Sequence, residues 1–493
     1  MSRLHLSVLM LLIAPLGCGG DGPTRYEISG TVTYDFVPVS GGRLDYGQTE
    51  SRPARHVTVQ FVAGGSVLAS ATADGNGGYS LEVATHRTGF LRARAESRQT
   101  GEPGWWFRVV DNTDIDALYT LDGSSFSTGT SDSRRDLHAG SGWTGQSYSM
   151  PRAAAPFAIL DTIILGADFV AEADPSIVFP QLDIHWSENN VPTEDEDGNP
   201  DPTTGEIGSS QYVPVDGLYL LGAEDNDTEE YDRHVILHEF GHYLEFTYGR
   251  VSTIGGPHAI GDHLDLRVAF SEGLATALAA IMLDDPIYRD TGGMRQGGSF
   301  GFNVEFTGVP TSGWYSEASI LELIYDLVDT SSDGNDTLAY PFSTIWSAIT
   351  GPVTTTRSVV SIFPFLNAVR TANPADTFAL DALAADQQIG PVTDDFGSNE
   401  TNDAGSGDVL PIYTELTVGG PAVNICSTDE FRSAKLSIDR LPEVSPPAMH
   451  DALFAAAASA KSSGARGNHA RTGGPTGRAP GPWDTIGRWR IGE

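Results

Sequence analysis

Cysteine is scarce in this chain of 493 residues, which contains two, Cys18 and Cys426. So few cysteines exclude a scaffold that is held together by several disulfide bonds. A chain of this length buries enough apolar surface to fold without them. Because Cys18 is a candidate for acylation, we expect Cys426 to have no intramolecular disulfide partner.

Positive charge is scarce as well. The sequence has 29 Lys and Arg against 65 Asp and Glu, which gives a formal net charge of −36. A chain this acidic repels the phosphates of nucleic acids and anionic membrane surfaces, so we expect no nucleic-acid partner.

An H-E-x-x-H motif is present at residues 238–242. Residues four apart share one face of a helix, so His238 and His242 can bind one metal ion. Two neutral imidazoles and a carboxylate are a ligand set typical of zinc, with a fourth position left for water. Glu239 is placed to take a proton from that water.

The residues around the motif predict the helix that it requires. Asp227 followed by Glu230 indicates an N-cap with its partner acid, and the helix of about 18 residues is expected to begin there. Apolar residues then recur at four-residue spacing, at Ile236, Phe240 and Leu244. The alternative is a surface helix that carries two His and a Glu by chance.

Glu272 is the expected third ligand. It begins an apolar, helix-favouring run at 271–280. A carboxylate on a buried helix needs a partner, which is either a metal ion or the helix dipole. We expect one zinc ion per chain. Residues between the motif and Glu272 that can compete as ligands or support them are His258, Asp262, His263 and Asp265.

These residues resemble the metal centre of the gluzincin-type metallopeptidases. The matching residues are His238, Glu239, His242 and Glu272, and the resemblance covers about residues 215–330. The spacing to Glu272 is longer than in thermolysin or the related aminopeptidases. The Asn-Glu-x-x-Ser-Asp and Gly-x-Met-Glu-Asn elements of those enzymes are absent, so the resemblance implies the zinc centre but not their specificity.

The resemblance also implies a downstream residue that stabilises the oxyanion. Tyr315 is the candidate, and its alternative is aromatic packing at a helix N-terminus. The implied function is an exported zinc metallopeptidase that hydrolyses peptide bonds in a peptide or protein substrate, with Glu239 as general base. The alternatives are an envelope binding or adhesion protein with a structural metal site, and a zinc hydrolase of non-peptide amides.

The expected fold is α+β, with a small antiparallel β-sandwich before a mainly helical zincin-like domain that has a small sheet. Alternating apolar residues at 28–34 and 57–62, and strands near 79–81 and 91–95, indicate the sandwich. Its turn followed by Gly-Tyr-Ser-Leu resembles the carboxypeptidase-regulatory, transthyretin-like fold, which implies a spacer or binding module.

The rest of the chain divides by composition and periodicity. A helix near Pro156 and strands at 182–186 and 217–222 are expected in the zincin-like domain, and the second strand is expected to pair with substrate backbone. The expected order is a signal peptide at 1–18, the sandwich at 26–96, a linker with irregular structure at 97–150, the zincin-like metallopeptidase domain at 151–395, a short β region at 396–430 and a disordered tail at 431–493.

Export is indicated by the N-terminus. The apolar segment at 4–16 is too short to span a bilayer. Residues 16–18 resemble a bacterial lipobox, although Pro15 stands where Leu is usual. We expect the mature protein to be anchored by lipid at Cys18 in a bacterial envelope, at the outer membrane, and to contact membrane only in this way. A freely secreted protein is the alternative.

Two other segments have unusual composition. The acidic loop at 194–201 has the residue types that bind calcium, but a solvated loop is favoured because acidic runs are usually solvating. After residue 430 the excess of acids disappears, with 9 Lys and Arg against 5 Asp and Glu at 431–493. This tail is expected to be disordered, and a changed reading frame would give the same switch.

Overall fold

The computed structural model describes residues 24–193, 200–331, 334–401 and 412–413. The main strands are β1 (Arg25–Phe36), β2 (Glu50–Pro53), β3 (Val57–Ala63), β4 (Ser66–Thr72), β5 (Gly78–Ala84), β6 (Thr88–Gln99), β7 (Trp105–Asp111), β13 (Leu182–Trp186), β14 (Gln211–Val213), β15 (Gly217–Leu220), β16 (Ile287–Gly292) and β17 (Gly298–Asn303). Shorter strands are β8 (Ala117–Leu118), β9 (Thr120–Asp122), β10 (Phe126–Ser127), β11 (Ser133–Arg134) and β12 (Leu137–Ala139).

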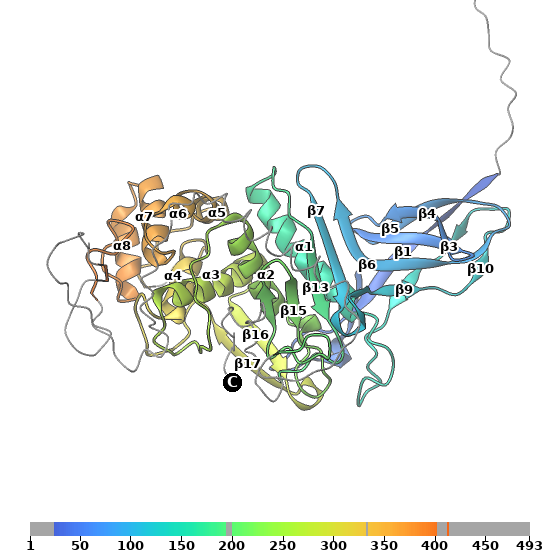
Figure 1. Ribbon diagram of the computed structural model, residues 1–493, viewed down its shortest axis with the longest axis horizontal. Coiled ribbons are helices and arrows are strands. Elements are labelled where there is room, and N and C mark those ends of the chain that lie inside the picture. The colour runs from blue at the N-terminus through green and yellow to red at the C-terminus, as the bar shows by residue number, and fades with distance from the viewer. Residues whose placement is uncertain (1–23, 194–199, 332–333, 402–411, 414–493) are drawn as a thin grey trace, which may run out of the picture.

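The helices gather toward the opposite end of the molecule from the first strands (Figure 1). This arrangement of sheets and helices is α+β, as expected. The α-helices are α1 (Ala155–Ala173), α2 (Arg233–Tyr248), α3 (Leu266–Leu283), α4 (Glu317–Asp326), α5 (Phe342–Thr350), α6 (Pro352–Thr355), α7 (Ile362–Ala372) and α8 (Thr377–Asp386). Short 3-10 helices are η1 (Tyr46–Gln48), η2 (Asn112–Asp114), η3 (Glu229–Tyr231) and η4 (Met294–Gln296).

Two sheets account for the N-terminal strands. β1 pairs with β2, β5, β11 and β12 in a five-stranded sheet, and β3, β4, β6 and β7 belong to a ten-stranded sheet. In β1 the buried side chains alternate with more exposed ones, because Ile28, Val32 and Tyr34 face the core. The expected strands at 28–34, 57–62, 79–81 and 91–95 are therefore confirmed.

The larger sheet continues past the expected end of the sandwich. β7 pairs with β6 on one side and runs parallel to β13 on the other, with Phe107 opposite Leu182. The prediction of an irregular linker at 97–150 was wrong here. The alternation that makes β7 a strand rests on three buried positions, Trp105, Phe107 and Val109, and the Gly- and Ser-rich sequence around them hides it.

The first helix joins the two ends of the molecule. α1 begins beside Pro156, as expected from the preference of proline for the first helical turn. Its Asp161 accepts a hydrogen bond from the Tyr34 hydroxyl at 2.8 Å and pairs with Arg55 at 2.5 Å. One hydrophobic core runs from the β1 sheet through α1 to the helices that follow. The sandwich is therefore packed against the rest of the chain.

Helix α3 is long and apolar enough to cross a membrane by length and composition, but 83% of its apolar window is buried inside the protein. It is the central helix between α2 and α4. The buried position of α3 therefore accounts for its apolar composition.

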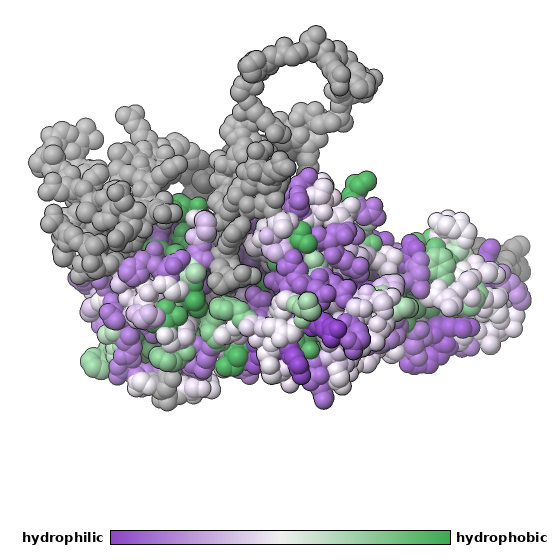
Figure 2. Space-filling view, turned by 90° about the horizontal axis from the view of Figure 1, so that it is seen from below, coloured by the Kyte–Doolittle hydropathy of each residue, from purple (hydrophilic) through white to green (hydrophobic). Residues whose placement is uncertain are grey.

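On the face drawn in Figure 2, hydrophobic residues occur in small separate groups among hydrophilic ones.

Several expectations fall outside the described residues. They concern the signal peptide and Cys18, most of the acidic loop at 194–201, most of the β region at 396–430, and the tail at 431–493.

Candidate metal centre

Helix α2 presents the two histidines of the motif on one face. The helix begins at Arg233 and has Asp232 at its N-cap position, so the expected start near Asp227 was wrong. The chain between them forms the 3-10 helix η3 instead. Asp232 makes no capping bond, and one of its oxygens instead accepts two hydrogen bonds from Thr291 of β16.

Helix α3 brings Glu272 to the same point. It begins at Leu266, and the Asp265 carboxylate caps it by accepting a hydrogen bond from the Arg267 amide at 3.0 Å. The expectation that Glu272 lies at the start of this helix was wrong, because it lies in the second turn and is 1% exposed. The carboxylate therefore lies too far from the helix N-terminus to be paired with the helix dipole.

The two helices cross closely. Gly241 of α2 faces Ala275 of α3, and a Cβ at Gly241 would lie 3.0 Å from the Ala275 Cα. A side chain at this position would hold the helices apart. The glycine therefore allows Glu272 to reach the face of α2 that carries His238 and His242.

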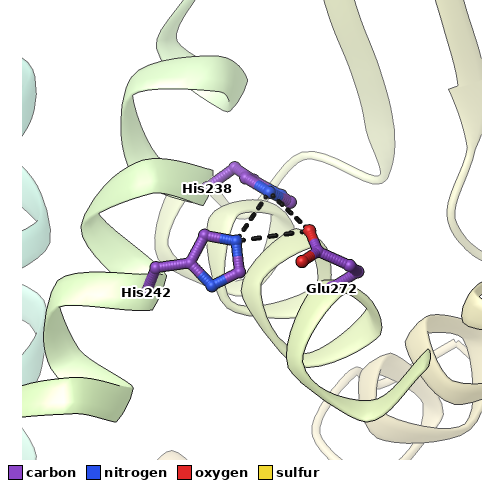
Figure 3. A group of neighbouring side chains, drawn as sticks. All are labelled: His238, His242 and Glu272. Atoms are coloured by element: carbon purple, nitrogen blue, oxygen red, sulfur yellow. Dashed lines mark hydrogen bonds and ion pairs between the residues drawn. The ribbon is translucent and has the colours of Figure 1, made fainter. Parts of the chain in front are cut away.

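The three predicted ligands form a compact triangle (Figure 3). The Nε2 atoms of His238 and His242 are 3.1 Å apart, and they lie 3.4 Å and 3.3 Å from Glu272 Oε2. Ligands about 2.0–2.1 Å from a tetrahedral zinc ion are roughly 3.3 Å from one another. The other carboxylate oxygen, Glu272 Oε1, is buried and has no hydrogen-bond partner. The spacing and burial of these residues therefore fit a bound metal ion.

Charge at the centre is balanced within the triangle and by one further histidine. Burial opposes ionisation of Glu272, but the imidazoles of His242 and His258 hold its pKa well below the usual range. In turn, burial opposes protonation of His242, and the Glu272 carboxylate outweighs it and raises the pKa of His242 to about 9. The carboxylate is therefore an anion at neutral pH, which is the form that binds a metal ion.

A second layer of contacts orients the ligands. His238 Nδ1 lies 3.0 Å from the Thr276 hydroxyl, one helical turn after Glu272 on α3. This bond directs Nε2 of His238 toward the centre of the triangle. Glu245 Oε2 accepts a hydrogen bond from the Ser271 hydroxyl at 2.6 Å and lies 4.0 Å from His242 Nδ1. Burial raises the pKa of Glu245 to about 7.

Glu239 is the buried acid of the motif, and its side chain is 4% exposed. Burial raises the pKa of Glu239, while the positive fields of His238 and His242 act in the opposite direction. The backbone amide of Tyr212 in β14 lowers this pKa as well. β14 therefore lies beside the ligand helix at this carboxylate.

The strand at the sheet edge differs from the one expected. β15, within the segment expected to bind substrate backbone, pairs with both β13 and β14, so both of its edges are occupied. β14 is the terminal strand of the ten-stranded sheet. Because a peptide can add only to an edge, β14 replaces β15 in that hypothesis.

The four residues named as competing ligands differ in their contacts. Asp262 accepts a hydrogen bond from the Ala259 amide at 3.0 Å, and Asp265 caps α3 and pairs with Arg267. His263 packs on the ring of Tyr315, with 4.9 Å between the centroids. His258 differs from these three because its Nε2 lies 3.4 Å from Glu272 Oε2.

His258 connects the triangle to a carboxylate that the sequence did not point to. Its Nε2 is also 3.9 Å from Glu317 Oε2, at the first residue of α4. Both side chains are buried, and burial raises the pKa of Glu317. Glu317 lies two residues after Tyr315, and no role was predicted for it from the sequence. Its approach to His258 depends on the packing of α4 against α3.

Tyr315 lies immediately before α4, as expected. Its ring contacts Trp314 at 5.1 Å between centroids in addition to His263, and its carbonyl accepts a hydrogen bond from the Leu264 amide. These contacts fix its backbone beside the loop that carries His258. The oxyanion role of its hydroxyl stays a prediction.

No protein-family model and no curated protein matches this chain. Among solved structures, the major plantain pollen allergen Pla l 1 aligns at 14% identity over 23% of this chain and 94% of its own length, with a TM-score of 0.14. A 9R-lipoxygenase from Cyanothece PCC8801 aligns at 10% identity over 34% of this chain and 27% of its own, with a TM-score of 0.13.

Proposed function

We propose that this protein is a zinc-dependent metallopeptidase of the gluzincin type. The observation that carries the proposal is the triangle of His238, His242 and Glu272, whose donor atoms are 3.1–3.4 Å apart. Two imidazoles and one carboxylate are a ligand set of catalytic zinc sites that keep a position open. Zinc bound there supplies the Lewis acidity that activates water and polarises a carbonyl group.

Glu239 is the general base in this proposal. Its carboxylate is buried, and burial raises its pKa above that of an exposed glutamate, which makes it a stronger base toward a water proton. It takes a proton from the attacking water and passes it to the leaving amine. Tyr315 is the candidate donor to the oxyanion.

β14 is the proposed binding strand for the substrate backbone. It is a terminal strand of the large sheet and contacts α2, the helix that carries the general base. A peptide that adds to this edge lies in an extended conformation next to the ligand helix. Extended peptide or protein segments are therefore the proposed substrates.

The cellular setting is part of the proposal. The lipobox-like sequence at 16–18 and the net charge of −36 support an exported protein that is held by lipid at Cys18 in a bacterial envelope. The N-terminal strands, which resemble a transthyretin-like domain in sequence, then lie between the anchor and the metal centre along the chain.

One observation favours a second candidate function. His258 Nε2 lies as close to Glu272 Oε2 as the two motif histidines do. If His258 acted as a fourth protein ligand, the site would be closed, and closed sites are structural. The protein would then be a binding or adhesion protein of the envelope.

A comparison of zinc binding with peptide cleavage separates these functions. The zinc-loaded full chain and its Glu239→Gln variant are incubated with a mixed peptide library, and products are identified by mass spectrometry. We expect cleavage by the parent and a loss of about 10²–10⁴-fold in the variant, with zinc content unchanged. A matched variant, Glu172→Gln on an exposed part of α1, should cleave like the parent.

Two results would contradict the peptidase proposal. One is a zinc-loaded parent that cleaves no peptide while His258→Ala loses zinc as strongly as His242→Ala, which indicates a closed structural site. The other is full activity in Glu239→Gln, which removes the general base from the mechanism.

A further inference from the structure

A second group of acidic side chains lies before the first turn of α2. It consists of Asp227, Glu229, Asp232 and Asp290, and one oxygen from each lies within 4.8 Å of the others. The first three flank or belong to η3, and Asp290 is contributed by β16. Glu229 is 2% exposed and Asp232 is 1% exposed.

Hydrogen bonds hold these carboxylates in place. The Ser210 hydroxyl donates to Glu229 Oε1 at 3.0 Å. Thr291 donates to Asp232 Oδ2 from its amide at 2.9 Å and from its hydroxyl at 2.7 Å. A backbone bridge between Asp227 and Gly292 brings β16 against the segment before α2. The group is therefore fixed by neighbours on both segments.

Glu229 and Asp232, the two most buried acids of the group, each have one carboxylate oxygen that accepts none of these hydrogen bonds. Glu229 Oε2 and Asp232 Oδ1 are buried and have no hydrogen-bond partner. Within the described parts of the chain, Glu229, Asp232 and Asp290 form no ion pair with Arg or His, and lysine is absent from the sequence before residue 435. Buried carboxylate oxygens without a partner are costly unless a cation binds them.

We propose that Asp227, Glu229, Asp232 and Asp290 form a calcium site that is separate from the zinc centre. All four donors are oxygens, which suit a hard cation. The proposed zinc centre differs, because two of its three donors are imidazole nitrogens. Calcium accepts several carboxylates in irregular geometry, whereas magnesium keeps most of its water. Four carboxylates around one point therefore favour calcium.

The electrostatics of the group agree with this geometry. Burial and the neighbouring carboxylates raise the pKa of Glu229 and of Asp232, and burial raises the pKa of Asp290 to about 6. Mutual repulsion of this kind disappears when a divalent cation binds.

The site links the start of the zinc-ligand helix to a hairpin that is distant in sequence. Asp232 directly precedes α2, and Asp290 belongs to β16, which pairs with β17. A cation held by both segments fixes the position of the first turn of α2, two turns before His242. Calcium should therefore stabilise the fold around the zinc centre without being a ligand of zinc.

The test uses the zinc-loaded full chain after removal of calcium by dialysis. Calcium binding is measured by isothermal titration and by metal analysis, and the melting temperature is recorded with calcium, with magnesium and with neither. We expect one calcium ion per chain and a rise in melting temperature by a few degrees at about 100 times the Kd, with a smaller effect of magnesium.

Two variants of the site and one control make the test specific. Glu229→Gln and Asp290→Asn should each weaken calcium binding by about tenfold or more, because each removes one carboxylate. Without calcium, they should melt at or above the temperature of the parent, because each relieves repulsion. Asp114→Asn, which changes an exposed acid, should bind calcium like the parent.

The proposal fails if the parent binds no calcium, if magnesium stabilises it equally, or if both variants bind calcium like the parent. Asp290 is partly exposed, so Asp290→Asn provides a folded variant if Glu229→Gln does not fold. Zinc content is measured in every sample. Loss of the calcium result with zinc and peptide cleavage intact would leave the peptidase proposal standing.

Discussion

Glu272 offers the sharpest test of the metal centre. Replacing it with alanine removes a carboxylate that lies within 3.4 Å of both motif imidazoles and is itself 1% exposed. Protein zinc sites with four ligands bind with about 10–16 kcal/mol, so one ligand contributes roughly 3 kcal/mol. Since about 1.4 kcal/mol corresponds to a factor of ten, the zinc Kd should rise by about a hundredfold.

The assay is competition for zinc with a chromophoric chelator, combined with metal analysis. Glu272→Gln is the companion variant, because it keeps the size of the side chain and one oxygen but removes the charge, so its Kd should lie between those of the parent and Glu272→Ala. Glu172→Ala changes an exposed acid on α1 and should leave the Kd at the parent value.

Glu272→Ala should also change the pKa of His258 in the protein without zinc. In the parent, the Glu272 carboxylate outweighs burial and raises the pKa of His258 to about 10. When the carboxylate is removed, Glu317 and the Gly256 carbonyl still oppose the effect of burial, but the pKa of this imidazole falls. Nuclear magnetic resonance titration of the histidines measures this change. A folded Glu272→Ala variant whose zinc Kd stays within threefold of the parent would refute the assignment of Glu272 as a ligand.

Three other predictions concern the surroundings of the site. Thr276→Val should weaken zinc binding by about tenfold in the chelator assay, because it removes the hydroxyl next to His238 Nδ1, whereas Thr276→Ser should not. A chain that begins near residue 140 lacks β7, so β13 loses its parallel neighbour. It should therefore show no cooperative melting transition by circular dichroism. A stable fold would show that the sheet divides between β7 and β13. In the zinc-free protein, the raised pKa of His242 stabilises the fold, and this contribution is fully present below about pH 6.5. It is lost as the pH rises through about 9, so the melting temperature should fall over this range. Melting temperatures that do not fall would contradict the charge balance described above.

The local parts of the site could be predicted from sequence. The i and i+4 spacing of His238 and His242 requires only a helix, and the apolar repeat around them indicated one. Glu272 could be selected because a carboxylate inside an apolar run needs a partner. These inferences depend on neighbours in sequence, whose geometry is fixed by the helix itself.

The parts that failed depend on contacts between distant segments. Asp227 and Glu230 have the spacing of a helix start, but Asp227 bridges to Gly292 of β16, residues 229–231 form η3, and α2 begins at Arg233. β7 has too short an alternation to stand out until β6 and β13 flank it. The nearness of Glu317 to His258 depends on how α4 packs, for which no sequence spacing exists.

The contact between Gly241 and Ala275 has a consequence for the choice of metal. The distance between the two ligand helices is set by backbone against a methyl group, with no flexible side chain between them. A contact of this kind sets a lower limit on the separation of the helices, so neither helix can shift bodily toward the other. The smallest space open to an ion between the three ligands is then set by the helix crossing as much as by the ligand side chains themselves.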